Sequence, residues 1–263
     1  MKTFDPSKHR ARKRFGQNFL QDDSIIDRIV NSINAKKGDN LLEIGPGLGA
    51  ITKQLLQQTK KINVIELDRD IIPKLKFNCD GLGELNLMQT DALKVDYSQF
   101  QEQGPLRIVG NLPYNISTPL LFHLFKFLPH IKDMHFMLQK EVVQRIVAEP
   151  GTKAYGRLTV MTQAVCDAKL LFLVPPESFT PAPKVDSAIV YLAPRKVPLE
   201  ISDPALFNSL VTDAFNQRRK TLRNVWKKRV TVEQLELLNI EPTIRPEKVS
   251  IDDFVKVANF LAL

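Results

Sequence analysis

The chain has 263 residues, of which 43% are hydrophobic and 25% charged, as in ordinary globular proteins, and its length suits one large domain with a small second one. No apolar run approaches the ~18 residues of a membrane span, and no apolar core of a secretory signal follows the basic N-terminus. The two cysteines lie far apart and the four histidines lack ligand spacing, which argues against a disulfide framework and predicts no metal site. We therefore expect a cytoplasmic protein without a membrane segment.

The positive charge of the chain is concentrated near its two ends. The formal net charge is +8; residues 1–16 hold six Lys or Arg and one acid, and residues 218–229 hold seven and no acid. Two such segments predict contact with a polyanion such as nucleic acid. The alternative for each segment is a solvated face of a helix.

Short apolar segments alternate with helical patterns through the first part of the chain. An amphipathic helix is predicted over 22–33, where Asp22 or Asp23 can act as the N-cap. Further helices are predicted over 50–58, 71–83 and 118–128. The predicted strands cover 39–45, 61–68, 85–93, 106–114 and 133–139. This alternation is typical of an α/β fold with a mostly parallel sheet and helices on both faces.

The pattern changes toward the C-terminus. Two β-rich runs, 168–174 and 186–194, predict an antiparallel hairpin at the sheet edge, joined by a proline-rich connection. After Pro198 only helical spacing remains. We therefore predict an α/β domain over 1–198 and a small all-α domain over 199–263.

The segment GPGLG, residues 45–49, follows the first predicted strand and opens a helix. Glycines let the backbone approach a ligand, and the helix N-terminus offers free N–H groups. Such a turn is compatible with NAD, a flavin or S-adenosylmethionine, but it lacks the GxxxxGK pattern of ATP-hydrolysing enzymes.

Acidic residues end the next two predicted strands. Glu66 lies about 20 residues beyond the glycines, where a carboxylate can accept both hydroxyls of a ribose. Asp91 is placed to accept a hydrogen bond from an adenine amino group. Each acid has the alternative of a helix cap or a surface residue. Together with EIGPGLG and GNLPY, the second acid favours S-adenosylmethionine over NAD.

The segment GNLPY ends the fourth predicted strand and suits methyl transfer to an exocyclic amine. The lone pair of adenine N6 is delocalised, so Asn111 Oδ1 and the Leu112 carbonyl are expected to accept the two N6 hydrogens and free it. Pro113 makes the loop rigid, and Tyr114 offers a face on which a base can stack, worth ~1–3 kcal/mol. Catalysis of this kind depends on positioning without a covalent intermediate. The alternative is an ordinary Asn-x-Pro turn.

The order and spacing of these motifs resemble those of the rRNA adenine N6-dimethyltransferases, closest to the bacterial small-subunit (16S) branch. The resemblance covers nearly the whole chain and also includes FGQNFL at 15–20, FTPAPKVDSA at 179–188 and FNQRRKTLRN at 215–224. It implies a Rossmann-like class I S-adenosylmethionine-dependent methyltransferase fold. The implied reaction is dimethylation of two adjacent adenosines in the 3′-terminal hairpin of 16S rRNA, within the 30S subunit or its precursor, with S-adenosylhomocysteine as product.

The resemblance also implies individual roles. Phe179 would stack on the flipped base opposite Tyr114, although an ordinary core phenylalanine is the alternative. Residues expected to contact the cofactor are Asn18, Leu20, Gly45, Gly47, Glu66, Asp91 and Asn111. Basic residues expected to grip RNA phosphates are Arg10, Arg12, Lys13, Arg14, Arg218, Arg219, Lys220 and Arg223, the last four at helical spacing.

Three other functions compete with this prediction. The same chemistry acts on 23S rRNA in the macrolide-resistance methyltransferases, which share the cofactor motifs. A non-catalytic relative, such as a mitochondrial transcription factor, would bind nucleic acid only; the intact NLPY argues against it. An NAD dehydrogenase would need a His or Lys placed for hydride transfer, and the sequence offers none. We expect a monomeric enzyme.

Overall fold

The computed structural model describes residues 18–263, and the side chains of residues 102 and 103 are left out. The predicted RNA-binding residues Arg10, Arg12, Lys13 and Arg14 therefore lie outside the described residues.

The chain divides into two compact units. One comprises 18–140 and Leu170–Ala193, the other Glu141–Lys169 and Pro194–Leu263. The prediction of a single division at residue 198 differs from this result, because it placed 141–169 with the sheet. A boundary between folding domains stays a prediction.

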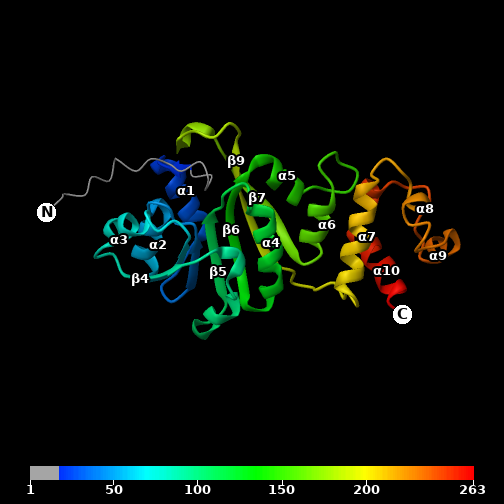
Figure 1. The fold of residues 1–263 in the computed structure, drawn as a ribbon, viewed down its shortest axis with the longest axis horizontal. Coiled ribbons are helices and arrows are strands. Elements are labelled where there is room, and N and C mark those ends of the chain that lie inside the picture. Colours follow the sequence, from blue (N-terminus) through cyan, green and yellow to red (C-terminus); the bar gives the residue numbers. More distant parts are fainter. Residues whose placement is uncertain (1–17) are drawn as a thin grey trace. The chain divides into compact units, whose positions relative to one another are not determined.

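The first unit is built on a seven-stranded sheet with the strand order β4-β3-β2-β5-β6-β9-β7 (Figure 1). The strands from β2 to β6 pair in parallel, and β9 runs antiparallel to β6. The strands are β2 (Asn40–Ile44), β3 (Lys61–Glu66), β4 (Glu84–Gln89), β5 (Leu106–Asn111), β6 (Ile131–Gln139), β7 (Cys166–Val174) and β9 (Ser187–Pro194). This confirms the predicted strands and the mostly parallel sheet.

The order of the strands determines where a ligand can bind. From β2 the chain continues outward on one side through β3 and β4, and on the other through β5 and β6. The carboxyl ends of β2 and β5 therefore flank a switch point, where open α/β sheets hold their ligands. The predicted edge hairpin is confirmed as a neighbouring pair, with β7 at the edge and β9 inside it.

Helices flank this sheet (Figure 1). Asp22 is the N-cap of the first one, since its Oδ1 accepts from the backbone N–H groups of Ser24 at 3.0 Å and Ile25 at 3.2 Å. The helices are α1 (Asp23–Ile33), α2 (Ala50–Thr59), α3 (Ile72–Cys79) and α4 (Ser117–Leu124). Short 3-10 turns are η3 (Ala92–Lys94), η4 (Tyr97–Gln103), η5 (Phe125–His130) and η6 (Pro176–Ser178). A separate two-stranded sheet pairs β1 (Phe19–Leu20) antiparallel with β8 (Phe179–Thr180).

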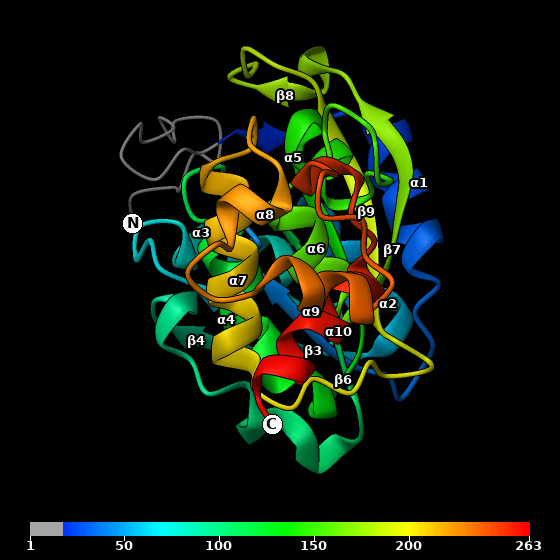
Figure 2. The same cartoon turned by 90° about the vertical axis from the view of Figure 1, so that its right-hand side faces the viewer.

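The second unit packs helices around an aromatic core. Its elements are α5 (Lys140–Ile146), α6 (Arg157–Gln163), α7 (Pro204–Asn216), α8 (Leu222–Val225), α9 (Val232–Leu237), η7 (Pro246–Lys248) and α10 (Ile251–Leu261). Figures 1 and 2 show α7 beside α10. Buried Trp226 donates to the Leu210 carbonyl at 3.1 Å, and buried Tyr155 donates to the Val249 carbonyl at 2.8 Å. This contact of Tyr155 explains why the segment Glu141–Lys169 belongs to the same unit as the C-terminal helices.

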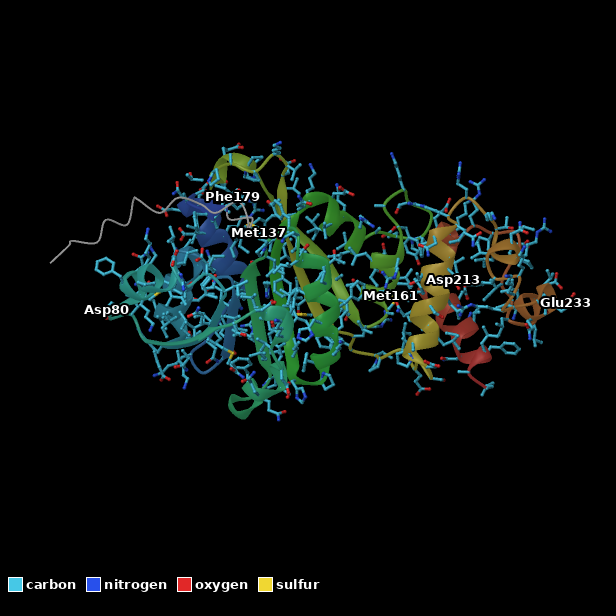
Figure 3. All side chains as sticks on the ribbon, viewed as in Figure 1. Asp80, Met137, Met161, Phe179, Asp213 and Glu233 are labelled. Atoms are coloured by element: carbon cyan, nitrogen blue, oxygen red, sulfur yellow. The ribbon has the colours of Figure 1, made fainter. Side chains whose placement is uncertain are left out.

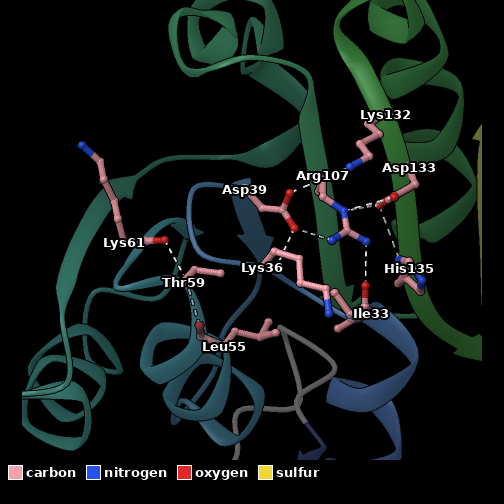
Figure 4. A network of polar contacts seen from close by, with 10 residues as sticks. All are labelled: Ile33, Lys36, Asp39, Leu55, Thr59, Lys61, Arg107, Lys132, Asp133 and His135. Carbon is pink, nitrogen blue, oxygen red and sulfur yellow. Dashed lines mark hydrogen bonds and ion pairs between the residues drawn. The ribbon is translucent and has the colours of Figure 1, made fainter.

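A buried ion network holds the first residues of β5 (Figure 4). The Arg107 guanidinium donates to Asp39 at 2.7 Å, to Asp133 at 3.0 and 3.1 Å, and to the Ile33 carbonyl at 2.6 Å. His135 lies 3.7 Å from Asp133, but burial lowers its pKa to about 4, so it is neutral at pH 7. Arg107 therefore ties β5 to β6, to the end of α1 and to the turn before β2.

Arg107→Met should lower the free energy of unfolding by about 3–5 kcal/mol, because it leaves the buried Asp133 carboxylate without its ion-pair partner. Urea denaturation measures the change. Arg69→Met is the control: Arg69 pairs with Asp70 at 3.6 Å and is 83% exposed, so its loss should have little effect. An unchanged midpoint in Arg107→Met would contradict the anchoring role.

Candidate active site

A cavity of about 360 Å³ lies at the carboxyl ends of β2, β3 and β5, within the first unit. That volume is in the range of small-molecule sites. All seven residues expected to contact the cofactor line it: Asn18, Leu20, Gly45, Gly47, Glu66, Asp91 and Asn111. Leu112, Pro113 and Tyr114 of the GNLPY segment line it as well. The structure thus brings together residues that are up to 96 positions apart in sequence.

The glycine turn between β2 and α2 depends on left-handed backbone angles. Gly45 has φ +69° and Gly47 has φ +57°, a region that side chains rarely adopt. The position of a Cβ on Gly47 would lie 3.4 Å from the Phe19 ring. The turn therefore places the N-terminus of α2 at the cavity and leaves room for the β1 segment beside it.

Gly110 explains the first letter of GNLPY, to which sequence analysis assigned no role. A Cβ there would lie 2.5 Å from the backbone carbonyl oxygen of Ile44 in β2, closer than atoms can approach. Only glycine allows this contact between β5 and β2. The contact brings Asn111 next to the glycine turn.

Glu66 ends β3 at the cavity, as predicted. Its Oε1 accepts from the Asp68 backbone N–H at 2.8 Å. Burial raises the pKa of the Glu66 carboxyl, although backbone N–H groups of Asp68, Gly47 and Leu67 oppose this by stabilising its ionised form.

Asp91 lies two residues beyond the end of β4 and caps η3, where its Oδ1 accepts from the Leu93 backbone N–H at 3.0 Å. The alternative of a helix cap is therefore correct for Asp91. Capping uses only Oδ1, so Oδ2 can still accept a hydrogen bond from a ligand in the cavity that Asp91 lines. The Tyr97 hydroxyl donates to the Ala92 carbonyl at 2.9 Å and holds this turn in place.

Glu43 is a further acid at the cavity that sequence analysis missed. It lies inside β2, is only 2% exposed, and its Oε2 has no hydrogen-bond partner in the described part of the chain. Burial and, to a smaller extent, the charge of Glu66 raise its pKa to about 7, although a contact with the Thr52 hydroxyl opposes this. The sequence signal that could have identified it is an acid between the apolar residues Leu42 and Ile44.

The residues of the GNLPY loop have defined partners. The Leu112 backbone N–H donates to the Met137 carbonyl of β6 at 3.2 Å. The Asn111 Nδ2 donates to the Asn18 backbone carbonyl at 3.2 Å, which leaves Oδ1 as the end of the amide available to a ligand. The Tyr114 hydroxyl and the Ser187 Oγ form a hydrogen bond of 2.8 Å.

Phe179 does not line the cavity, in contrast to the expected position opposite Tyr114. It is 4% exposed and belongs to the hydrophobic cluster that includes Leu20 and Met137 (Figure 3). Its backbone pairs with Leu20 in the β1–β8 ladder, which directs it into this core. The core alternative describes its position here, and a stacking role stays a prediction.

The basic residues near the C-terminus do not form a helical row. Arg218, Arg219 and Lys220 lie in the turn after α7, and only Arg223 lies in α8, so the predicted helical spacing is wrong. Arg218 donates to the Lys153 carbonyl at 2.7 Å and lies 3.7 Å from the Glu247 carboxylate. The positive charge of Arg218 is therefore paired with groups of the second unit.

Residues 18–263 show no sign of a membrane segment or a metal site. None of the helices there combines the length and apolar character that crossing a membrane requires. The same residues contain no cluster of three or more His, Cys, Asp or Glu that can hold a metal ion.

Comparison with known proteins places these features in a family. The family model described as Ribosomal RNA adenine dimethylase matches residues 8–263. The chain is 53% identical over 254 residues to a protein of Idiomarina loihiensis named Ribosomal RNA small subunit methyltransferase A, covering 96% of this chain and 88% of that one. It is 54% identical over 256 residues to the protein of the same name from Pseudomonas aeruginosa, covering 97% and 96%.

Solved structures show the same fold. A dimethyladenosine transferase from Plasmodium falciparum superposes with a TM-score of 0.79 at 29% identity, over 91% of this chain and 95% of that one. The 23S rRNA methyltransferase ErmE superposes with a TM-score of 0.72 at 24% identity, over 94% and 100%, a likeness of fold alone.

Glu43→Gln should change how stability depends on pH. The folded-state pKa of Glu43 is raised from 4.5 to about 7, so the folded protein binds an extra proton between these values and loses stability as pH rises. The variant lacks this loss of about 3 kcal/mol. Urea denaturation measures the free energy of unfolding of both proteins at pH 4.5 and pH 8. Between these pH values the variant should become more stable relative to the wild-type protein. The same difference in stability at both pH values would contradict the raised pKa.

Gly110→Ala should weaken cofactor binding, because its methyl group cannot fit against the Ile44 carbonyl and must displace the loop, at a cost of about 1–3 kcal/mol. Calorimetric titration with S-adenosylhomocysteine measures the binding. The control is Gly156→Ala, where the nearest atom to a Cβ is 3.9 Å away. Equal affinities for both variants would refute the packing argument.

Proposed function

Because the chain belongs to the ribosomal RNA adenine dimethylase family, we propose that it dimethylates N6 of two adjacent adenosines in the 3′-terminal hairpin of 16S rRNA, with S-adenosylmethionine as methyl donor. The observation that supports this most strongly is the GNLPY loop. It holds Asn111 and Tyr114 at the same cavity as the glycine turn and Glu66. An acceptor for an amine and a place for a cofactor thus lie side by side.

The residues at the cavity fit S-adenosylmethionine. Glu66 would hold the ribose, Asp91 the adenine amine, and the glycine turn the methionine end. Among the described residues, three carboxyl groups and no Lys, Arg or His line the cavity. This suits a cationic ligand better than the pyrophosphate of NAD. When bound, S-adenosylmethionine supplies an electrophilic methyl group on a sulfonium.

Asn111 would make the target amine nucleophilic. Its Nδ2 is engaged by the Asn18 carbonyl, so its Oδ1 is oriented to accept one N6 hydrogen, with the Leu112 carbonyl as the second acceptor. This draws the nitrogen away from planarity and aims its lone pair. Pro113 and the Leu112–Met137 hydrogen bond keep the acceptors in place before the substrate arrives. The protein contributes position and electrostatics, with no covalent step.

Tyr114 would hold the base that is flipped from the RNA into the cavity. It lines the cavity and is half-buried, so a ring face is available for stacking. Phe179 as a second stacking partner stays part of the proposal and requires the side chain to leave its core position.

The substrate would be the rRNA within the 30S subunit or its precursor, bound by a monomer in the cytoplasm. The basic turn after α7, with Arg219, Lys220 and Arg223, would contact phosphates and orient the RNA rather than identify its bases. Eight relatives that are 51–55% identical are named Ribosomal RNA small subunit methyltransferase A, which favours 16S over 23S rRNA.

The proposed function is tested with purified 30S and 50S precursors that lack the modification. Labelled S-adenosylmethionine should transfer methyl groups to 30S material only, and mass spectrometry should find dimethyladenosine at two adjacent positions. Incorporation only into 50S material would favour the 23S alternative, and no incorporation into either would refute methyltransferase activity.

Asn111→Ala should lower methyl transfer by at least about 100-fold, the scale for losing one preorganised electrostatic contact. Its affinity for 30S subunits should remain. Single-turnover rates and filter binding separate the two effects. Asn31→Ala, on the exposed side of α1, is the control and should keep full activity. Near-normal turnover in Asn111→Ala would mean that GNLPY is only a structural turn with no role in catalysis.

Arg219→Gln combined with Lys220→Gln should weaken RNA binding and flatten its salt dependence, by about one slope unit for each lost phosphate contact. Arg218 is left intact because it contacts Lys153 and Glu247. Lys256→Gln is the matched control, since Lys256 pairs with Asp253 at 2.8 Å in the same unit. If affinity depends on salt concentration in the double variant as it does in the wild-type protein, the basic turn does not contact RNA phosphates.

A further inference from the structure

Ser187 contacts the GNLPY loop from a different strand, although neither the cavity nor the reaction described above includes it. Its Oγ lies 2.8 Å from the Tyr114 hydroxyl, and the residue is fully buried as the first residue of β9. Tyr114 itself lines the cavity. One end of this side chain is therefore held inside the protein while its ring borders the site.

The position of Ser187 is set by its neighbours. It pairs with Gln139 at the end of β6. The preceding residue, Asp186, is joined to Lys140 twice: its carbonyl accepts from the Lys140 backbone N–H at 2.9 Å, and its carboxylate pairs with the Lys140 Nζ at 2.9 Å. These contacts fix the backbone that carries the Ser187 hydroxyl.

The same pair of strands also holds the start of the loop. Leu112 donates to the Met137 carbonyl, and Met137 pairs with Ile189 of β9. The loop is thus fastened to β6 at Leu112 and to β9 at Tyr114. Two attachments, two residues apart in the loop, define its orientation more strictly than one.

An aromatic ring on a loop needs such an attachment. The second side-chain torsion of tyrosine has a broad energy well, so backbone position alone does not set the plane of the ring. A hydrogen bond at the far end of the phenol restricts this torsion. Displacement of a reacting group by about 1 Å can reduce a rate about 100-fold.

We propose that Ser187 is a positioning residue for methyl transfer, which holds the Tyr114 ring at the angle that a stacked adenine requires. This inference rests on the proposed function, since it needs a base in the cavity. It gives the run KVDSA, at the end of the proline-rich connection, a role in the reaction. The strand that begins there supports the ring on which the substrate base would stack.

The test compares Ser187→Ala, Tyr114→Phe and the double variant in methyl transfer to unmodified 30S subunits. Each single variant should lower kcat about tenfold, within the range for small misplacement, while the dissociation constant for S-adenosylhomocysteine stays within about twofold. The double variant should be no slower than either single one, because both remove the same hydrogen bond. Ser32→Ala is the matched control: its hydroxyl donates to the Ile29 carbonyl in α1, and its kcat should not change.

Two results would overturn the inference: single variants with wild-type kcat, or a double variant whose losses multiply. Tyr114→Phe retains the ring and removes only the hydroxyl, so it decides the question if Ser187→Ala does not fold; normal kcat in that variant refutes the role of the hydrogen bond. Failure of the wild-type protein to methylate 30S subunits would instead refute the proposed function, and the two failures are therefore distinct.

Discussion

The Arg107 guanidinium fixes the strand on which the candidate active site depends. Arg107 lies near the start of β5, and Asn111 ends the same strand. Its contacts with Asp39, Asp133 and the Ile33 carbonyl tie that strand to three other parts of the first unit. A buried charge with so many fixed partners tolerates little displacement, because each lost contact leaves an unpaired group in a medium of low polarity.

The other end of β5 is fixed by close approach rather than by charge. Gly110 brings the strand against the Ile44 carbonyl at the point where β2 enters the glycine turn. The GNLPY loop and the glycine turn are therefore held next to each other by backbone contact. Side-chain flexibility has little influence on a contact between backbones. Such a contact suits a reaction whose rate depends on the distance and angle between the reacting groups.

Charge is distributed in two opposite ways in this chain. The sequence as a whole is basic, with its Lys and Arg gathered near the ends, yet the cavity is lined by Glu43, Glu66 and Asp91. Burial raises the pKa of Glu43 and Glu66, so the site carries a cost that a bound cation would reduce. Basic segments suit the polyanionic RNA, and the acidic cavity suits the sulfonium donor.

Much of the fold followed from local pattern. Alternating apolar segments and helices predicted the parallel sheet, and GPGLG, Glu66 and GNLPY marked the strand ends that meet at the cavity, because parallel strands present their carboxyl ends at one edge. Local pattern was misleading for the basic residues after α7, since the spacing of Arg218 and its neighbours also fits a turn.

By itself, then, the sequence determined which candidate residues lie at the end of which strand. It also determined the family to which the chain belongs. Only tertiary structure decided that Glu43 is buried with no hydrogen-bond partner for Oε2 among residues 18–263, that Phe179 packs in the core, and that the Ser187 and Tyr114 hydroxyls form a hydrogen bond. The physical reason is that burial and hydrogen bonding depend on contacts between distant segments. Tyr114 and Ser187 are 73 residues apart, and no local periodicity records that they meet.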